Sequence, residues 1–217
     1  FVKKSDENWM NKYFSCSEKV KIDLFLRYGS IAAAGDRHLA EFCPGDWYLK
    51  DKETVDKWGF ALTPVSWRKG DLEKRLERSE KLYSGEEKFE LKETGEEGVQ
   101  QIRALLGLGD LVTNVNIPNY GQIPNLPIGA VVETNACFRA NSLNPVFAGN
   151  IPQAIYPLIS RVCGEQEQVV DCALNRDLDG VFNAFAADPN MCISVSDARK
   201  LFDEMVDNTK EYLKMYF

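Results

Sequence analysis

The sequence predicts an α+β fold that is mostly helical and contains a small antiparallel sheet. Two central stretches, 110–117 and 130–138, alternate apolar and polar residues with the period of a β-strand. The loop between them, 119–129, is rich in proline, glycine and asparagine, as expected for a connection between strands. Four other stretches favour helices: 18–27, 69–97 with a Gly/Glu-rich link at its end, 96–106 and most of 152–217.

Two segments lack a clear period. Residues 30–42 begin with small residues and continue into three polar ones, Asp36, Arg37 and His38. This pattern predicts a tight turn that brings the three side chains to one place. Residues 43–67 contain two prolines, two glycines and three tryptophans, and are expected to be long and irregular.

Composition narrows the class of protein. The chain has 217 residues and a formal net charge of −7. An acidic chain gains nothing from counterion release on nucleic acid, so we expect no nucleic-acid partner. No apolar run approaches the roughly 18 residues that a membrane helix needs, so we expect no membrane partner.

The cysteines do not predict a metal centre or a disulfide framework. The six are widely spaced without any CxxC pair, and His38 is the single histidine. We therefore expect free thiols and a cytoplasmic protein. The first residue is not methionine and no signal-peptide pattern follows it, which suggests a sequence that begins within a longer protein.

Two clusters could carry chemistry. In the first, Arg37 has the planar geometry that binds a carboxylate or phosphate, beside an acid and an imidazole. The alternative is an ion pair of Arg37 with Asp36 or Glu41, with His38 merely packed. The second is a set of asparagines near the loop, whose amides either form turns or bind sugar hydroxyls: Asn114, Asn116, Asn119 and Asn125.

Both clusters lie in stretches that resemble a known family. RYGSIAAAGDRHLAEF at 27–42 is similar to the segment that follows the nucleotide-binding domain in family 4 glycoside hydrolases. NVNIPNYGQIPNLPIGAVVE at 114–133 is similar to that family's Asn-x-Pro-Asn-x-Gly-x-Ile-x-Asn-Leu-Pro-x-x-x-Val-Val-Glu stretch. GNIP at 149–152 and the Asp188-Pro189 pair continue the resemblance, which spans about 18–213.

The resemblance implies the whole of 1–217 to be a single carboxy-terminal substrate domain of a two-domain enzyme with a lactate-dehydrogenase-like architecture. In such enzymes NAD⁺ oxidises the sugar C3 hydroxyl, a divalent metal, usually Mn²⁺, polarises the carbonyl, and a base removes the C2 proton before elimination, water addition and hydride return. The amino-terminal half, which this sequence lacks, holds NAD⁺ and the metal. We therefore expect neither to bind this chain by itself.

The resemblance also implies roles for individual residues. Tyr28 or Asp36 would serve as the base, since the register leaves both open. The galactosidase-like members carry Glu-Ser-Ser-Glu-His where this chain has 33–38, so an acid is replaced and Arg37 is gained. A cation suits an anionic sugar, which favours the α-galacturonidase-like branch. The substrate-binding candidates are Arg37, His38, Asn116 and Asn119.

Other functions remain open at this point. A hydroxy-acid dehydrogenase domain has the same architecture but would not need the Pro/Asn loop. A non-catalytic sugar-binding or interaction module is also compatible with the sequence. The expected partner is a small sugar, and the resemblance implies a homo-oligomer, a dimer or tetramer.

Overall fold

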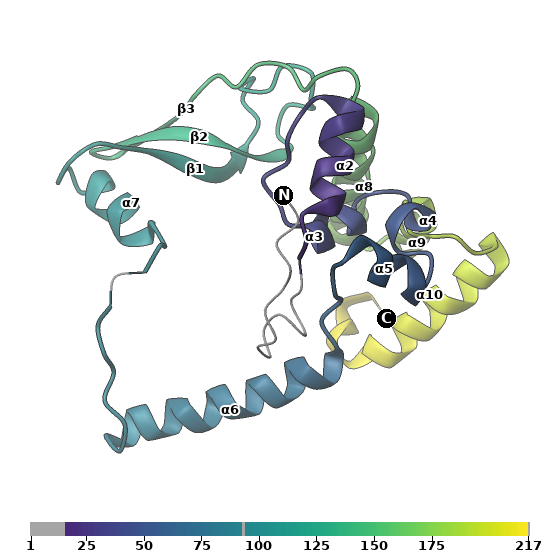
Figure 1. Cartoon of the computed structure of the whole chain (residues 1–217), viewed down its shortest axis with the longest axis horizontal. Helices are drawn as coiled ribbons and strands as arrows, with labels where there is room; N and C mark the ends of the chain where they lie inside the picture. Colours follow the sequence, from purple (N-terminus) through teal and green to yellow (C-terminus); the bar gives the residue numbers. More distant parts are fainter. Residues whose placement is uncertain (1–15, 93, 217) are drawn as a thin grey trace.

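The computed structural model describes residues 16–92 and 94–216, and it has the α+β architecture that the sequence predicts. Helices dominate, and one small sheet lies at one side of the molecule (Figure 1). The helices are α2 (Lys19–Tyr28), α3 (Asp36–Glu41), α4 (Gly45–Tyr48), α5 (Lys52–Trp58), α6 (Val65–Ser84), α7 (Gly98–Leu105), α8 (Tyr156–Asn175), α9 (Leu178–Ala187) and α10 (Val195–Thr209), followed by two short 3-10 turns, η1 (Lys210–Tyr212) and η2 (Lys214–Tyr216).

The sheet confirms both predicted strands and adds a third. Strands β1 (Leu111–Pro118), β2 (Val131–Arg139) and β3 (Ser142–Pro145) pair antiparallel in the order β1-β2-β3. Along β2 alternate residues are buried, so the period-2 pattern in the sequence reports its core face. The sequence did not predict β3, because only four residues form it after a turn in which Asn141 adopts a positive φ of 54°.

Three small apolar clusters form the core of the described residues. The first joins α2 to α5 around Val20 and Tyr48, and the second lies between α7 and the sheet around Ala136. The third lies under the loop that joins β1 to β2, around Ile123 and Leu126, and it packs against the start of α8. The third cluster is therefore where the sheet side and the helical side of the molecule meet.

The expectation of irregular structure at 43–67 is wrong. This stretch contains α4, α5 and the start of α6. Pro44 and Pro64, which look like breakers in the sequence, are the residues immediately before α4 and α6. Proline is tolerated there because the first turn of a helix leaves its N–H groups without helical partners. Gly59 then ends α5 with a φ of 73°.

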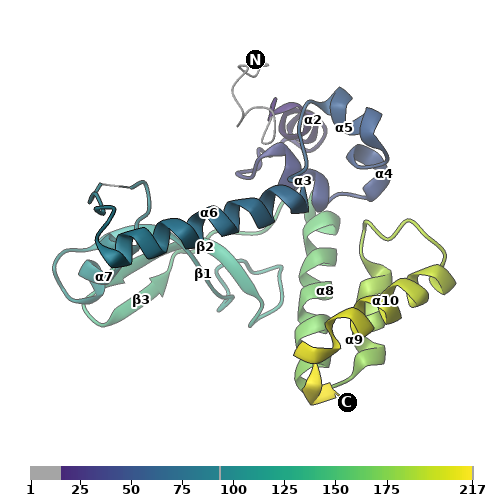
Figure 2. The ribbon, with the colours of Figure 1, turned by 90° about the horizontal axis from the view of Figure 1, so that it is seen from below.

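The helices expected at 18–27 and 96–106 are confirmed to within two residues as α2 and α7, whereas the charged helix begins at Val65 and already ends at Ser84. Gly29 ends α2 with a φ of 70°, and the side chain of Ser194 caps α10 by accepting a hydrogen bond from the Asp197 N–H. The charged helix α6 is 20 residues long, and none of these residues, all of them described, is buried. In Figures 1 and 2 it runs as a separate rod from the α5 side toward α7.

Helices α8, α9 and α10 form the remaining unit. Figure 2 shows α10 lying across α9, with α8 beside them. Phe202 of α10 packs between Phe182 and Phe185 of α9, at ring distances of 5.5 and 5.6 Å. Among the described helices, none is long and apolar enough to cross a bilayer.

Candidate active site

A cavity of about 660 Å³ lies where the first and third clusters meet. Its walls come from the end of α2 and the turn after it, from the loop between β1 and β2 with the start of β2, and from the first half of α8. The lining is mostly apolar, with a few polar side chains: Tyr28, Ser30, Glu133, Gln166 and Glu167. This size and this mixture are typical of small-molecule sites.

The wall formed by α2 is fixed by a hydrogen-bond network around the buried Tyr48. Tyr48 is 2% exposed, and its hydroxyl donates to Asp23 Oδ2 at 2.5 Å. Arg27 pairs with the same carboxylate at 2.8 Å and stacks over Trp47, 4.5 Å from the ring centre. Desolvation raises the pKa of Tyr48, so the phenol stays protonated and remains a donor. The network holds Tyr28, the next residue, at the cavity.

Cys43, which follows α3, is not a ready nucleophile. Cys43 lines the cavity, and burial raises the pKa of that thiol to about 11. A thiol with such a pKa is neutral at physiological pH, so Cys43 behaves as a small apolar side chain. Tyr28 and Ser30 are the hydroxyl groups that the α2 wall contributes.

The predicted turn that gathers Asp36, Arg37 and His38 is wrong, because these residues form the first turn of α3. Successive residues on a helix point about 100° apart, so the three side chains diverge. Asp36 points inward and is fully buried, and its Oδ1 accepts a hydrogen bond from the Lys21 N–H at 3.1 Å. Leu39 of this turn lines the cavity, whereas Asp36, Arg37 and His38 do not.

Arg37 and His38 lie on the outer side of α3. Arg37 is half-buried, and its Nη1 donates to Thr63 Oγ1 while its Nη2 is 3.2 Å from His38 Nε2. His38 Nδ1 is 3.3 Å from Glu41 Oε2, so Glu41, one of the acids expected to pair with Arg37, contacts the histidine.

Asn119 is the organising residue of the loop between β1 and β2. It is fully buried, and its backbone pairs with Ala130 and Gly129 at 2.8 and 2.9 Å. Its side-chain amide makes five contacts with the loop backbone: Nδ2 with the carbonyls of Ile123, Leu126 and Pro127 at 2.9, 3.0 and 3.1 Å, and Oδ1 with the N–H groups of Gly121 and Ile123 at 3.1 and 3.2 Å. This geometry argues for a structural role and against direct contact with a sugar.

Asn125 extends the same loop to the helical side. Its amide forms a reciprocal pair with the backbone of Ile151, at 2.9 Å from Nδ2 to the carbonyl and 2.8 Å from the N–H to Oδ1. Ile151 precedes α8 and lines the cavity. The turn-forming alternative thus describes Asn119 and Asn125 well.

Asn116 occupies a different position from Asn119. It is exposed on β1, directly opposite Glu133 of β2, and directly opposed residues share one face of a sheet. Glu133 lines the cavity, whereas Asn116 is its partner on β1 and is not among the lining residues. We did not single out Glu133 from the sequence. Its signal was present, because it lies on the polar side of the alternating strand that follows the Pro/Asn loop.

Comparison with known proteins identifies the family. The profile described as the Family 4 glycosyl hydrolase C-terminal domain matches residues 1–191. The chain belongs to this family. An alpha-galacturonidase from Thermoanaerobacterium saccharolyticum is 63% identical over 98% of the chain, and an alpha-galactosidase from Rhizobium meliloti is 25% identical over 94%. The chain spans 46% and 44% of these relatives, so it corresponds to less than half of each.

Solved structures show the same fold. The crystal structure of a Bacillus subtilis protein proposed to be a glucosidase has a TM-score of 0.85 and 46% identity, covering 94% of this chain and 46% of that one. A 6-phospho-alpha-glucosidase from gut microorganisms, solved with NAD and Mn²⁺, has a TM-score of 0.59 and 19% identity, covering 94% of this chain and 44% of that one. The family 4 domain therefore has the α+β fold of its relatives.

The buried amide of Asn119 generates a stability prediction. Asn119→Ala leaves several buried carbonyl and N–H groups without partners, so we expect the free energy of unfolding to fall by about 2 to 4 kcal/mol. Asn116→Ala, three residues earlier on β1 and exposed, is the matched control and should change it by less than about 0.5 kcal/mol. Urea denaturation of the three proteins measures both values. Equal losses in the two variants would show that the loop does not depend on Asn119.

Proposed function

We propose that this family 4 domain is the substrate-binding part of an NAD- and Mn²⁺-dependent glycosidase that hydrolyses the O-glycosidic bond of α-galacturonides. The observation that carries the proposal is the 63% identity, over 98% of the chain, to a protein named alpha-galacturonidase. The relative named alpha-galactosidase reaches only 25%. The family match also favours a glycosidase over the hydroxy-acid dehydrogenase and over the non-catalytic module.

The described residues do not suit NAD⁺ or the catalytic metal. Binding of a dinucleotide needs a glycine-rich turn between a strand and a helix. The loop around Asn119 follows β1 but leads into a second strand, β2, and so does not provide such a turn. The described residues that line the cavity include two cysteines, Cys43 and Cys163, and no histidine. We therefore assign NAD⁺ and Mn²⁺ to the amino-terminal half of the full-length protein. There they would supply reversible oxidation and carbonyl polarisation.

The geometry supports Tyr28, rather than Asp36, as the base contributed by this domain. Tyr28 lines the cavity, whereas Asp36 is fully buried at the start of α3 and is not among the lining residues. A base has to come within hydrogen-bonding reach of the proton that it removes. We propose that Glu133, which lines the cavity, and Asn116, its partner on β1, bind sugar hydroxyls.

Arg37, which lies on α3 outside the cavity lining, is proposed to recognise the carboxylate of the uronic acid, with His38 beside it. A guanidinium has the planar geometry that matches a carboxylate, and Thr63 fixes the position of Arg37 Nη1. The compartment proposed for the enzyme is the reducing cytoplasm, and the six free thiols of the structure are compatible with it. The homo-oligomeric state remains a prediction.

Arg37 should determine the class of substrate. A charge-assisted pair in a partly dry site contributes about 2 to 4 kcal/mol when one partner is removed. At about 1.4 kcal/mol per tenfold, Arg37→Ala in the full-length enzyme should lower kcat/KM for a galacturonide by roughly 30- to 1000-fold. The value for a galactoside should change far less, since that sugar has no carboxylate to lose.

Two further variants sharpen the assay. Arg37→Lys should recover part of the loss, because an ammonium keeps the charge but not the planar fork. Lys69→Ala, at an exposed cation on α6, is the matched control and should leave both substrates unaffected. Equal losses of kcat/KM on the two sugars in Arg37→Ala would refute the carboxylate role and would leave the family assignment intact.

Tyr28→Phe tests the proposed base. The ring and its contact with Arg27 are kept, so only the hydroxyl is removed. Loss of a general base lowers kcat by about 10²- to 10⁴-fold, with KM and the melting temperature close to those of the wild type. Tyr120→Phe, at an exposed tyrosine of the loop, is the control and should be fully active. Wild-type kcat in Tyr28→Phe would exclude the tyrosine as the base.

A further inference from the structure

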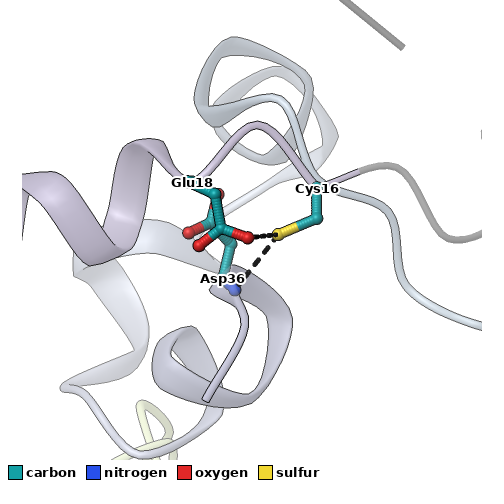
Figure 3. A group of neighbouring side chains, drawn as sticks. All are labelled: Cys16, Glu18 and Asp36. Carbon is teal, nitrogen blue, oxygen red and sulfur yellow. Dashed lines mark hydrogen bonds between the residues drawn. The ribbon is translucent and has the colours of Figure 1, made fainter. Parts of the chain in front are cut away.

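A group of three potential metal ligands lies at the start of α2, outside the cavity. Cys16 and Glu18 precede the helix, and Asp36 comes from the first turn of α3 (Figure 3). One ligand atom from each lies within 4.8 Å of the other two. Cys16 Sγ is 3.3 Å from Glu18 Oε1 and accepts a hydrogen bond from the Asp36 N–H at 3.4 Å. None of the three lines the cavity.

The second observation is an unsatisfied oxygen that belongs to the buried member of the group. Asp36 is fully buried, and only its Oδ1 is hydrogen-bonded, to the Lys21 N–H. Its Oδ2 has no hydrogen-bond partner among the described residues. Leaving a charged oxygen buried and unpaired is costly, so such an atom needs an explanation. Glu18 differs, because its Oε2 is 2.7 Å from Lys21 Nζ.

We propose that Cys16, Glu18 and Asp36 Oδ2 bind one divalent transition-metal ion of the zinc type. Thiolate and carboxylate ligands at roughly 2.3 and 2.0 Å from a tetrahedral zinc lie about 3.5 Å from each other, close to the 3.3 Å between Cys16 Sγ and Glu18 Oε1. The sulfur ligand favours zinc over the oxygen-preferring Mg²⁺ and Ca²⁺. Cys16 is exposed, so water can take the fourth position.

Metal binding at this site requires only the deprotonation of Cys16, and it would link two segments of the chain. The Cys16 S–H proton passes to solvent, a metal–sulfur bond replaces it, and no oxidant or reductant takes part. The ion would tie the segment before α2 to the first turn of α3, the turn that carries Arg37. The site is separate from the metal that the proposed function places in the amino-terminal half, and it does not depend on that function.

Cobalt absorbance tests the proposal on the chain of 217 residues. Co²⁺ added to the chelator-treated, reduced protein should give one equivalent of binding and a sulfur-to-cobalt charge-transfer band, and one equivalent of Zn²⁺ should abolish that band. Cys16→Ser should remove the band, and Glu18→Gln should weaken Zn²⁺ binding at least tenfold in calorimetry. Cys192→Ser, the same exchange at another exposed cysteine, should keep both the band and the stoichiometry.

Three results would overturn the proposal: no stoichiometric binding of either ion to the wild-type chain, a charge-transfer band that persists in Cys16→Ser, or an equal loss in Cys192→Ser. Cys16 is exposed and Glu18 only partly buried, so both variants are expected to fold. Circular dichroism and the urea midpoint of each variant, measured without metal, confirm that a lost signal reports lost ligation.

Discussion

The arrangement of the cavity depends on the buried amide of Asn119. One side chain closes the loop between β1 and β2 by contacting five backbone groups, and this holds Ile123 and Leu126 under the loop as the third apolar cluster. The same cluster packs on the start of α8, and Asn125 adds the reciprocal pair with Ile151. The loop thus joins the sheet to the helices and forms one wall of the cavity.

The opposite wall depends on a second buried polar residue. Asp36 joins the beginning of α3 to the beginning of α2 by accepting a hydrogen bond from the Lys21 N–H. The N-terminal end of a helix dipole is positive and stabilises an acidic side chain at this position. Tyr48, Asp23 and Arg27 fix the other end of α2. Between these two attachments the helix presents Leu24 and Tyr28 to the cavity. Each wall is therefore held by polar side chains of its own: Asn119 bonds to backbone groups of the loop, and Asp36 and Tyr48 hold α2.

Much of the fold could be predicted because its signals are local. The period-2 pattern gives β1 and β2, and Gly29 and Ser194 end and begin helices as their backbone preferences require. The short helices α3, α4 and α5 could not be recognised, since each has too few residues to show a period and is stabilised by the cluster around Tyr48. Both stretches that carry the resemblance, 27–42 and 114–133, contribute residues to the cavity lining.

The site was predicted less completely, for a physical reason. Sequence chemistry shows which side chains could bind a ligand, but not whether they point inward. Asp36 and Asn119 have suitable chemistry and are fully buried, whereas Tyr28 lines the cavity and Asn116 is exposed opposite the lining residue Glu133. Glu133 was overlooked among the polar residues of β2, because only the register opposite Asn116 places it beside the loop.

Hydrogen exchange of the full-length protein tests most directly the claim that the sugar binds between these two walls. Amide exchange is compared with and without galacturonic acid, with NAD⁺ and Mn²⁺ present in both samples. The account predicts slower exchange on adding the sugar in peptides covering 28–43 and 116–133, and unchanged exchange in α9 and α10. Protection confined to α9 and α10, with both cavity walls unaffected, would contradict it.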